Sequence, residues 1–260
     1  MTTNRRLVNV LGDPADTDVP TWVSADKEYE VSGAGPPFDP ASLNPTRWFR
    51  ATYPTGTWTD ETATANATED SADVTQGTAV NGLSPAHFAG PSGSNFFRCG
   101  DNNTAYGASA GSIVVLFKPA TAPTNNASTI LINGGLVSVQ GAGVFQCAFS
   151  DTGFRASAYD GSYHECTVAA SVSNWHVGAA KYDNTNVQAR TEATVFASAS
   201  TASSAPTLTT DDVLLGTSFQ GVNNTFDGDI LEILLFDTAL SDADVDNLIG
   251  YFNDRYALSL

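Results

Sequence analysis

Hydrophobic residues occur in short runs separated by turn residues from about residue 41 onward. The run SIVVLFKP at 112–119 has the composition of a buried strand. The runs at 128–134 and 136–140 adjoin a pair of glycines, and those at 174–183 and 187–196 flank Asn-Thr-Asn, so each pair predicts a hairpin. About ten short strands, with almost no helical periodicity, predict an all-β fold, an antiparallel β-sandwich of the jelly-roll type.

The segment FDGDILEILLFDTALS at 226–241 changes from a strand pattern to a helix-start signal. Its first part is apolar enough for a strand buried on both faces. Ser241 is placed as the N-cap of a helix, with Asp244 as the third residue of a capping box. The apolar residues that follow repeat at helical spacing: Val245, Leu248, Ile249 and Phe252. The pattern therefore predicts one short C-terminal α-helix that covers part of a sheet.

Residues 1–40 differ from the rest and predict an irregular N-terminal arm. Prolines and glycines interrupt this segment, most densely in SGAGPPFDP at 32–40. The residues Arg5, Arg6 and Trp22 are candidates for attachment to a larger structure, and the alternative is an arm that folds onto its own domain. Residues 41–260 would then form the jelly-roll domain.

The chain carries 28 acidic and 11 basic residues, a formal net charge of −17. Such a surface repels nucleic acid and anionic lipid, so neither is an expected partner. The charge suits either a saline environment or simple solubility. Because the sequence has no signal-peptide core and no apolar run of membrane-spanning length, we expect synthesis in the cytoplasm and no membrane insertion.

Three cysteines, Cys99, Cys147 and Cys166, lack the spacing of a zinc site. Their odd number favours reduced, buried thiols. The alternative is a disulfide between Cys147 and Cys166, if these two residues lie on neighbouring strands.

The last 35 residues resemble the C-terminal signature of laminin-G-like, concanavalin A-like jelly rolls. In that family a strand of the form F-x-G-x-I-x-E runs into a helix that begins L-S-x-x-E/D and ends Y-x-x-x-x-Y. Trp58 and Asp60 in GTWTDE resemble the W-x-D turn of the same family. The matching residues near the C-terminus are Phe226, Gly228, Ile230, Glu232, Leu240, Ser241, Asp244, Tyr251 and Tyr256. The resemblance covers residues 41–260 and implies the fold, which lectins, enzymes and structural proteins share.

Asp227, Asp229 and Glu232 form D-x-D-x-x-E, which resembles the E-x-D-x-x-E strand of jelly-roll glucanases. Retaining glycosidases need two carboxyl groups about 5 Å apart across the scissile bond. Simple alternation would place Glu232 on the face opposite the two aspartates unless a bulge intervenes. The alternative is that Gly228 and Glu232 belong only to the non-catalytic family signature.

Other candidate residues carry weaker signals. Ser109 in GASAG matches G-x-S-x-G, but a strand follows it where a nucleophile elbow needs a helix. The histidines His87, His164 and His176 show no metal or catalytic spacing. The family resemblance implies that calcium could bind to loop carboxylates, with the candidates Asp101, Asp151, Asp160, Asp183, Asp211 and Asp212. The aromatic candidates for sugar or partner contact are Trp22, Trp48, Trp58, Tyr159 and Tyr163, and among them Tyr159 and Tyr163 are the predicted glycan-binding pair.

From these features we expect a protein without catalytic activity at a virion surface. The hypothesis is a structural protein of a tailed virus, namely a capsid decoration, head-fibre or tail-associated component, made in the host cytoplasm. Its expected partners are capsid or tail proteins, further copies of itself in a homo-oligomer, and a cell-surface glycan. The alternatives are a free glycan-binding lectin, with or without calcium, and a jelly-roll glycoside hydrolase.

Overall fold

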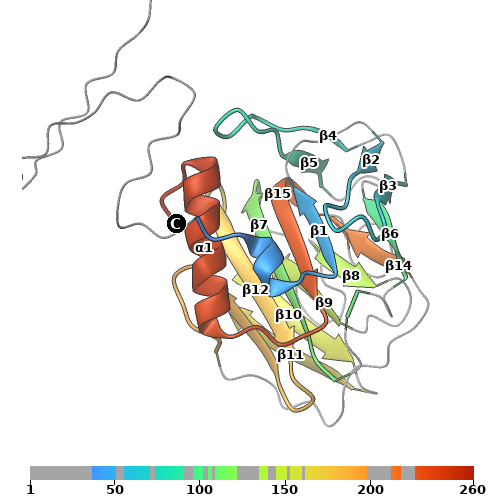
Figure 1. The fold of residues 1–260 in the computed structure, drawn as a ribbon, viewed down its shortest axis with the longest axis vertical. Helices are drawn as coiled ribbons and strands as arrows, with labels where there is room; N and C mark the ends of the chain where they lie inside the picture. Colours follow the sequence, from blue (N-terminus) through green and yellow to red (C-terminus); the bar gives the residue numbers. More distant parts are fainter. Residues whose placement is uncertain are drawn as a thin grey trace, which may run out of the picture. The chain divides into compact units, whose positions relative to one another are not determined.

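The computed structural model describes most of the predicted jelly-roll domain (Figure 1). The described residues are 37–50, 56–70, 74–90, 96–101, 105–106, 109–121, 135–139, 145–150, 153–159, 162–197, 212–217 and 226–260. Residues 1–36, which make up most of the predicted N-terminal arm, lie outside them, so the arm remains a prediction. The hairpin strand expected at 128–134 also lies outside the described residues.

Two antiparallel sheets form the domain, which confirms the predicted β-sandwich. Sheet A has the order β13-β12-β7-β15-β5-β4, with β1 also paired to β15. Its strands are β1 (Arg47–Arg50), β4 (Thr75–Gln76), β5 (Ala86–Ala89), β7 (Gly111–Pro119), β12 (His176–Tyr182), β13 (Val187–Thr191) and β15 (Asp227–Phe236). Sheet B has the order β11-β10-β9-β8-β14-β6-β3-β2. Its strands are β2 (Thr57–Trp58), β3 (Ala67–Glu69), β6 (Phe97–Asp101), β8 (Gly135–Val139), β9 (Phe145–Ser150), β10 (Gly153–Tyr159), β11 (Tyr163–Val168) and β14 (Asp212–Leu215).

Strand β15 is the central strand of sheet A, as its apolar run predicted. It pairs with β7 along one edge and with both β5 and β1 along the other. The ladder with β7 shifts register between Ile230 and Glu232, which marks a β-bulge at Leu231. Gly228 has φ +146°, and a Cβ there would lie 2.2 Å from the backbone oxygen of Lys118, so this position accepts only glycine.

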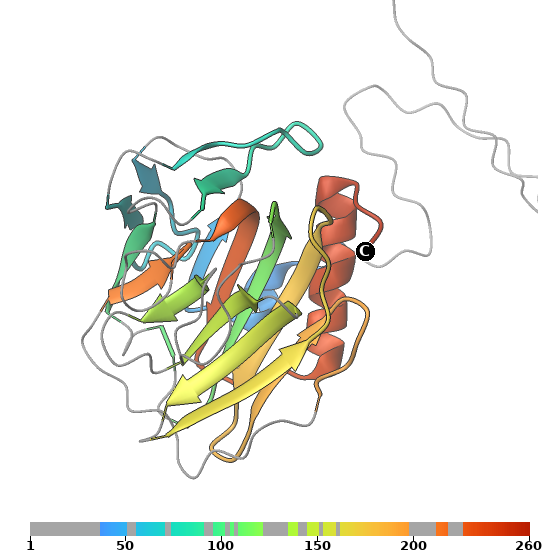
Figure 2. The ribbon, with the colours of Figure 1, turned by 180° about the vertical axis from the view of Figure 1, so that it is seen from behind.

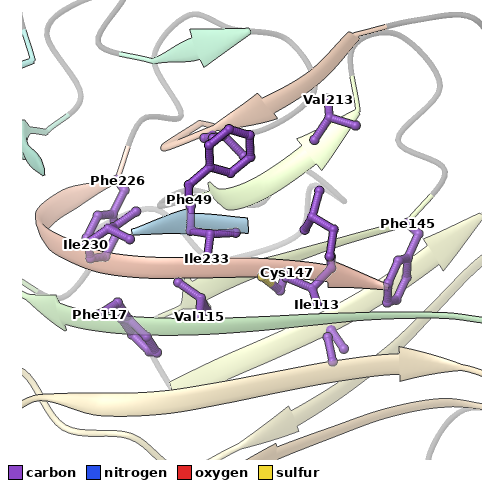
Figure 3. Packing of buried hydrophobic residues seen from close by; sticks show 14 of the residues in the cluster. Phe49, Ile113, Val115, Phe117, Phe145, Cys147, Val213, Phe226, Ile230 and Ile233 are labelled. Atoms are coloured by element: carbon purple, nitrogen blue, oxygen red, sulfur yellow. The ribbon is translucent and has the colours of Figure 1, made fainter. Parts of the chain in front are cut away.

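The main core lies between the two sheets. Figure 3 shows side chains from β7, β9, β14 and β15 meeting in this layer, among them Ile113, Cys147, Val213 and Ile233. Aromatic rings fill much of it, and Phe117 lies against Phe149, Phe154 and Phe226 at centroid distances of 5.8–6.2 Å. Inward-facing residues of both sheets therefore share one apolar layer, as expected for a sandwich.

Helix α1 (Asp242–Tyr256) covers the outer face of sheet A (Figure 1). The capping box of Ser241 and Asp244 is present as predicted. Val245, Leu248 and Phe252 are fully buried against the sheet, and each such side chain contributes about 1.5–3 kcal/mol relative to an exposed one. A short 3₁₀ helix, η1 (Pro40–Leu43), precedes β1, and Phe38 and Leu43 pack against the same layer.

Two expectations about the strands need correction. The described residues form fifteen strands, against about ten expected, because β2, β3 and β4 hold only two or three residues each and show no readable alternation.

Cys147 on β9 and Cys166 on β11 are not on neighbouring strands, since both align with Ala156 on the intervening β10. Two strand spacings separate them by about 9 Å, which is too far for a disulfide. All three cysteines are free and buried, as the odd number favoured.

Among the described residues, no helix combines the length and apolar composition needed to cross a membrane.

Candidate functional site

The outward face of sheet B is the candidate site, because helix α1 covers the corresponding face of sheet A. Strands β10 and β11 are the yellow strands of sheet B nearest the viewer in Figure 2. On β10, Phe154, Ala156 and Ala158 point into the core, so the residues between them point outward. The same alternation applies on β11, where Cys166 and Val168 belong to the core. The outward side chains of the two strands are Arg155, Ser157, Tyr159, Tyr163, Glu165 and Thr167.

The structure brings the two predicted glycan-binding tyrosines together. Tyr159 and Tyr163 are direct cross-strand partners at the end of the β10–β11 ladder. Their rings are tilted by 49° with centroids 4.8 Å apart, and both residues are half-buried. Burial raises the pKa of Tyr163, and the neighbouring Tyr159 and Glu165 act in the same direction. The pair therefore presents an aromatic surface that is held in place and reaches solvent.

Charged groups on this face are paired with one another. Nη1 of Arg155 lies 3.4 Å from both carboxylate oxygens of Glu165. On β6, Nε of Arg98 lies 2.6 Å from Asp70, and its Nη1 lies 3.5 Å from Asp212. Both arginines found on the outward face of the described sheet B thus have a carboxylate partner.

The middle of the same face holds two buried polar side chains without a partner among the residues that the structure describes. Ser157 lies opposite Gln146 of β9, and both are at most 1% exposed although they point away from the core. Ser157 Oγ and Gln146 Nε2 have no hydrogen-bond partner among the described residues. Ser157 and Gln146 are thus closed to solvent, and the accessible part of this face lies along the outward residues of β10 and β11 around the tyrosine pair.

Glu232 lies on the other side of the domain, enclosed beneath helix α1. Its carboxylate accepts hydrogen bonds from Trp48 Nε1, from Tyr256 Oη at 2.5 Å and from Tyr251 Oη at 3.2 Å, and Arg255 Nε lies 3.9 Å away. The side chain is 0% exposed. Burial raises the pKa of Glu232 to about 7, although the hydrogen bonds and Arg255 oppose that shift. Through these hydrogen bonds, Glu232 on β15 links helix α1 to strands β15 and β1 of sheet A.

Asp227 and Asp229 have separate partners. Asp227 accepts a hydrogen bond from Thr121, and Asp229 lies 2.8 Å from Nδ1 of His87. The bulge at Leu231 places Glu232 on the side of the strand that faces helix α1, the same side as the two aspartates. Simple alternation would have placed it on the opposite side unless a bulge intervened, and the bulge is present. Asp229 and Glu232 are each held by different partners, His87 for Asp229 and residues of β1 and α1 for Glu232.

His176 belongs to a polar network that the sequence did not reveal. Its Nδ1 lies 2.7 Å from Glu192 Oε1, and its Nε2 lies 3.2 Å from Ser171 Oγ. Nε2 also lies 3.1 and 3.0 Å from the backbone nitrogen and oxygen of Ser171, so the ring clamps the loop before β12 to the end of β13. Hydrogen bonding to Glu192 raises the pKa of His176 against the opposing effect of burial, which is the largest single contribution.

The remaining candidates do not gather into a site. Ser109 lies two residues before strand β7, so a strand follows it where a nucleophile elbow requires a helix. Trp58 is a core residue that donates to the backbone oxygen of Arg50, and Asp60 accepts backbone hydrogen bonds from Trp48, Thr62, Thr64 and Ala65. His164 lies on β11, on the same side as Cys166. Arg5, Arg6 and Trp22 lie outside the described residues.

The calcium candidates that the structure describes have separate protein partners. Asp183 accepts hydrogen bonds from Thr185 and Asn186, and Asp212 pairs with Arg98. Asp151, Asp160 and Asp211 lie outside the described residues, as does the side chain of Asp101. Within the described part of the chain, no three His, Cys, Asp or Glu side chains come close enough together to hold a metal ion.

Solved structures with the same fold come from proteins of diverse activity. The Trypanosoma rangeli sialidase superposes with a TM-score of 0.58 at 12% identity, over 80% of this chain and 32% of the sialidase. Domain 4 of AbnA, an extracellular arabinanase from Geobacillus stearothermophilus, superposes with a TM-score of 0.57 at 15% identity, over 78% of this chain and 97% of that domain. The binding domain of botulinum neurotoxin serotype G superposes with a TM-score of 0.58 at 13% identity, over 81% of this chain and 51% of that domain.

The present chain thus spans about a third of the length of the sialidases. At these identities the likeness shows the fold alone. No curated protein sequence matches the chain. The sequence model of the concanavalin A-like lectin/glucanases superfamily, of laminin-G type, matches residues 91–246, which include β6 to β15 and the start of α1. The chain therefore belongs to the concanavalin A-like lectin/glucanase superfamily.

Proposed function

We propose that this domain binds carbohydrate without cleaving it, on the outward face of sheet B. The observation that carries the proposal is the cross-strand pair of Tyr159 and Tyr163, half-buried and flanked by hydrogen-bonding side chains. The apolar face of a sugar ring packs on an aromatic ring, and polar groups beside the ring fix its hydroxyls. Arg155, Glu165 and Thr167 supply such groups on the same two strands.

A structural relative supports this proposal. The arabinanase domain was solved in complex with arabinotriose. The arabinanase domain is a separate jelly roll that corresponds to this chain over almost its whole length. A domain of this size can thus bind sugar as a module of a larger protein.

We propose binding without cleavage because Asp227, Asp229 and Glu232 are all engaged in contacts within the protein. Glu232 is enclosed and already accepts three hydrogen bonds, and its burial leaves no route for a sugar to its carboxylate. Asp227 and Asp229 are each engaged by a side chain of the protein, Thr121 and His87. A structural role explains all of these contacts.

Replacing Tyr163 by Ala tests the proposed function. The variant should weaken binding to a glycan-array ligand of the wild type at least about tenfold, because the stacking surface is lost. Tyr163→Phe keeps the ring and should retain most of the affinity, so the two variants separate stacking from loss of the hydroxyl. Binding by Tyr163→Ala at wild-type strength, or no binding of wild type to any glycan on a broad array, would contradict the proposal.

We further propose that this domain is carried on the virion of a tailed virus and is attached to it through residues 1–40. It is supported by the sequence of that segment, with Arg5, Arg6 and Trp22, and by the acidic charge of the chain. Sedimentation of the source material, with the chain followed by mass spectrometry, tests it. Retention on particles through a salt wash, and its loss when residues 1–40 are deleted, is the expected result, and a slowly sedimenting chain is the opposite one.

A further inference from the structure

We propose that the sheet B face selects neutral glycans, and that Glu165 sets this preference by pairing with the guanidinium of Arg155. The inference rests on the proposed carbohydrate-binding function and names the ligand class of the same site. An arginine beside two tyrosines would by itself suit a carboxylate-bearing sugar, since guanidinium groups bind carboxylates in a fork-like geometry. In the structure both carboxylate oxygens of Glu165 lie 3.4 Å from Nη1 of Arg155, so a protein carboxylate already pairs with this guanidinium at one nitrogen.

Glu165 and Arg155 lie beside the tyrosine pair, so Glu165 can repel an anionic ligand that is bound there. Glu165 lies two residues from Tyr163 on β11, and its register partner on β10 is Ser157, between Arg155 and Tyr159. Glu165 is 35% exposed and Arg155 is 18% exposed, so the carboxylate is the more accessible of the two to an arriving ligand. A ligand stacked on Tyr163 would therefore meet the negative charge of Glu165 before it reached the positive charge of Arg155.

Charge elsewhere on the molecule acts in the same direction. Arg98 on the same face is also held by carboxylates, from Asp70 and Asp212. The formal net charge of −17 adds a general repulsion of anions. A neutral sugar avoids both effects, and its hydroxyls can donate to Glu165 and accept from Arg155. Selectivity thus comes from a built-in repulsive group as well as from attractive ones.

Replacing Glu165 by Gln frees Arg155 and removes one negative charge while keeping the side-chain size. An exposed ion pair contributes about 0–1 kcal/mol to folding stability, so the variant should remain folded. The probes are galactose-terminated oligosaccharides and the same oligosaccharides capped with sialic acid, printed on one array and titrated in solution. Wild type should bind the neutral member at least about tenfold more tightly, and Glu165→Gln should reduce that ratio about tenfold or invert it.

Glu61→Gln is the matched control, because it removes a carboxylate from another exposed arginine pair, Arg50–Glu61, outside sheet B. It changes the net charge by the same amount and should leave the ratio at the wild-type value. A wild-type preference for the sialylated probes would overturn the inference and keep the proposed function. So would a ratio that Glu165→Gln leaves unchanged while Tyr163→Ala still weakens binding. Failure of wild type to bind any neutral or acidic glycan would overturn both.

Discussion

Glu232 is an acid that the domain buries completely and surrounds with donors from two elements. Trp48 on β1 and Tyr251 and Tyr256 on α1 all donate to its carboxylate, and Arg255 lies nearby. The loss of hydration nevertheless outweighs these contacts and raises the pKa of Glu232 to about 7. Near neutral pH this residue is therefore a titrating group inside the fold.

The raised pKa predicts that stability falls as pH rises through neutrality. In the unfolded chain Glu232 should titrate near its ordinary value of 4.5, so between that pH and about 7 only the folded state keeps the proton. The free energy of unfolding should thus contain a favourable contribution below pH 4.5 that is lost by about pH 7. Its size is on the order of 2–3 kcal/mol.

Urea denaturation of wild type and Glu232→Gln at pH 5 and pH 8 measures this contribution. The amide cannot titrate, so the fall in unfolding free energy between the two pH values should be smaller for the variant by roughly 2–3 kcal/mol. His176, whose pKa is also raised, contributes equally to both proteins and cancels in the comparison. Identical pH dependence of the two proteins would show that Glu232 is already ionised at pH 5.

At the scale of elements, helix α1 is attached at both ends and along its length. The Ser241–Asp244 capping box satisfies its N-terminus, and Arg190 on β13 pairs with Asp242 at 2.9 Å and Asp246 at 2.7 Å. The side chain of Arg190 is 3% exposed, whereas the side chains of Asp242 and Asp246 are 44% and 64% exposed, so a buried cation is paired with two acids that reach solvent. The helix is thus an integral layer of the domain.

Replacing Ser241 by Ala removes the N-cap acceptor and half of the capping box. The expected loss of unfolding free energy is about 0.5–2 kcal/mol, because the Asp244 backbone N–H loses its partner. Thermal or chemical denaturation followed by circular dichroism measures it. Ser259→Ala, at an exposed position beyond the helix, serves as the control and should have no effect. Equal stability of both variants would mean that water replaces the cap.

Elements with long local patterns were predictable from the sequence, and relations between elements were not. Strand β15 and helix α1 each carry ten or more residues of clear pattern. The side of Glu232 depended on a one-residue bulge at Leu231, which alternation cannot reveal. Tyr159 and Tyr163 could be chosen as aromatic candidates, but their contact depends on the register of β10 with β11. Likewise His176 and Glu192 meet only because β12 and β13 form a hairpin.

At the scale of the whole molecule, the net charge of −17 is the dominant electrostatic feature. Mutual repulsion among the acidic groups is weaker in the expanded unfolded chain, so this charge destabilises the folded state at low ionic strength. Neutral salt screens the repulsion over about 10 Å at 0.1 M and about 3 Å at 1 M.

The midpoint of thermal unfolding at pH 7 should therefore rise as NaCl is increased from about 0.01 to 1 M, where screening becomes strong. Differential scanning calorimetry at constant pH measures the midpoint. A series with equal concentrations of glycerol separates screening from a general solute effect. A midpoint that falls with NaCl would indicate that the attractive pairs, such as Arg190 with Asp242 and Asp246, outweigh the repulsion.

The place of β15 in the chain has a consequence for how the protein is made. Its neighbours β1, β5 and β7 all precede it, and it separates β7 from the other two in sheet A. Sheet A therefore stays in two parts until residue 236 has left the ribosome, and the edges of β5 and β7 remain open to pairing with other chains. Nascent chains halted before β15 should need protection by chaperones, which the complete chain no longer requires once that strand closes the sheet.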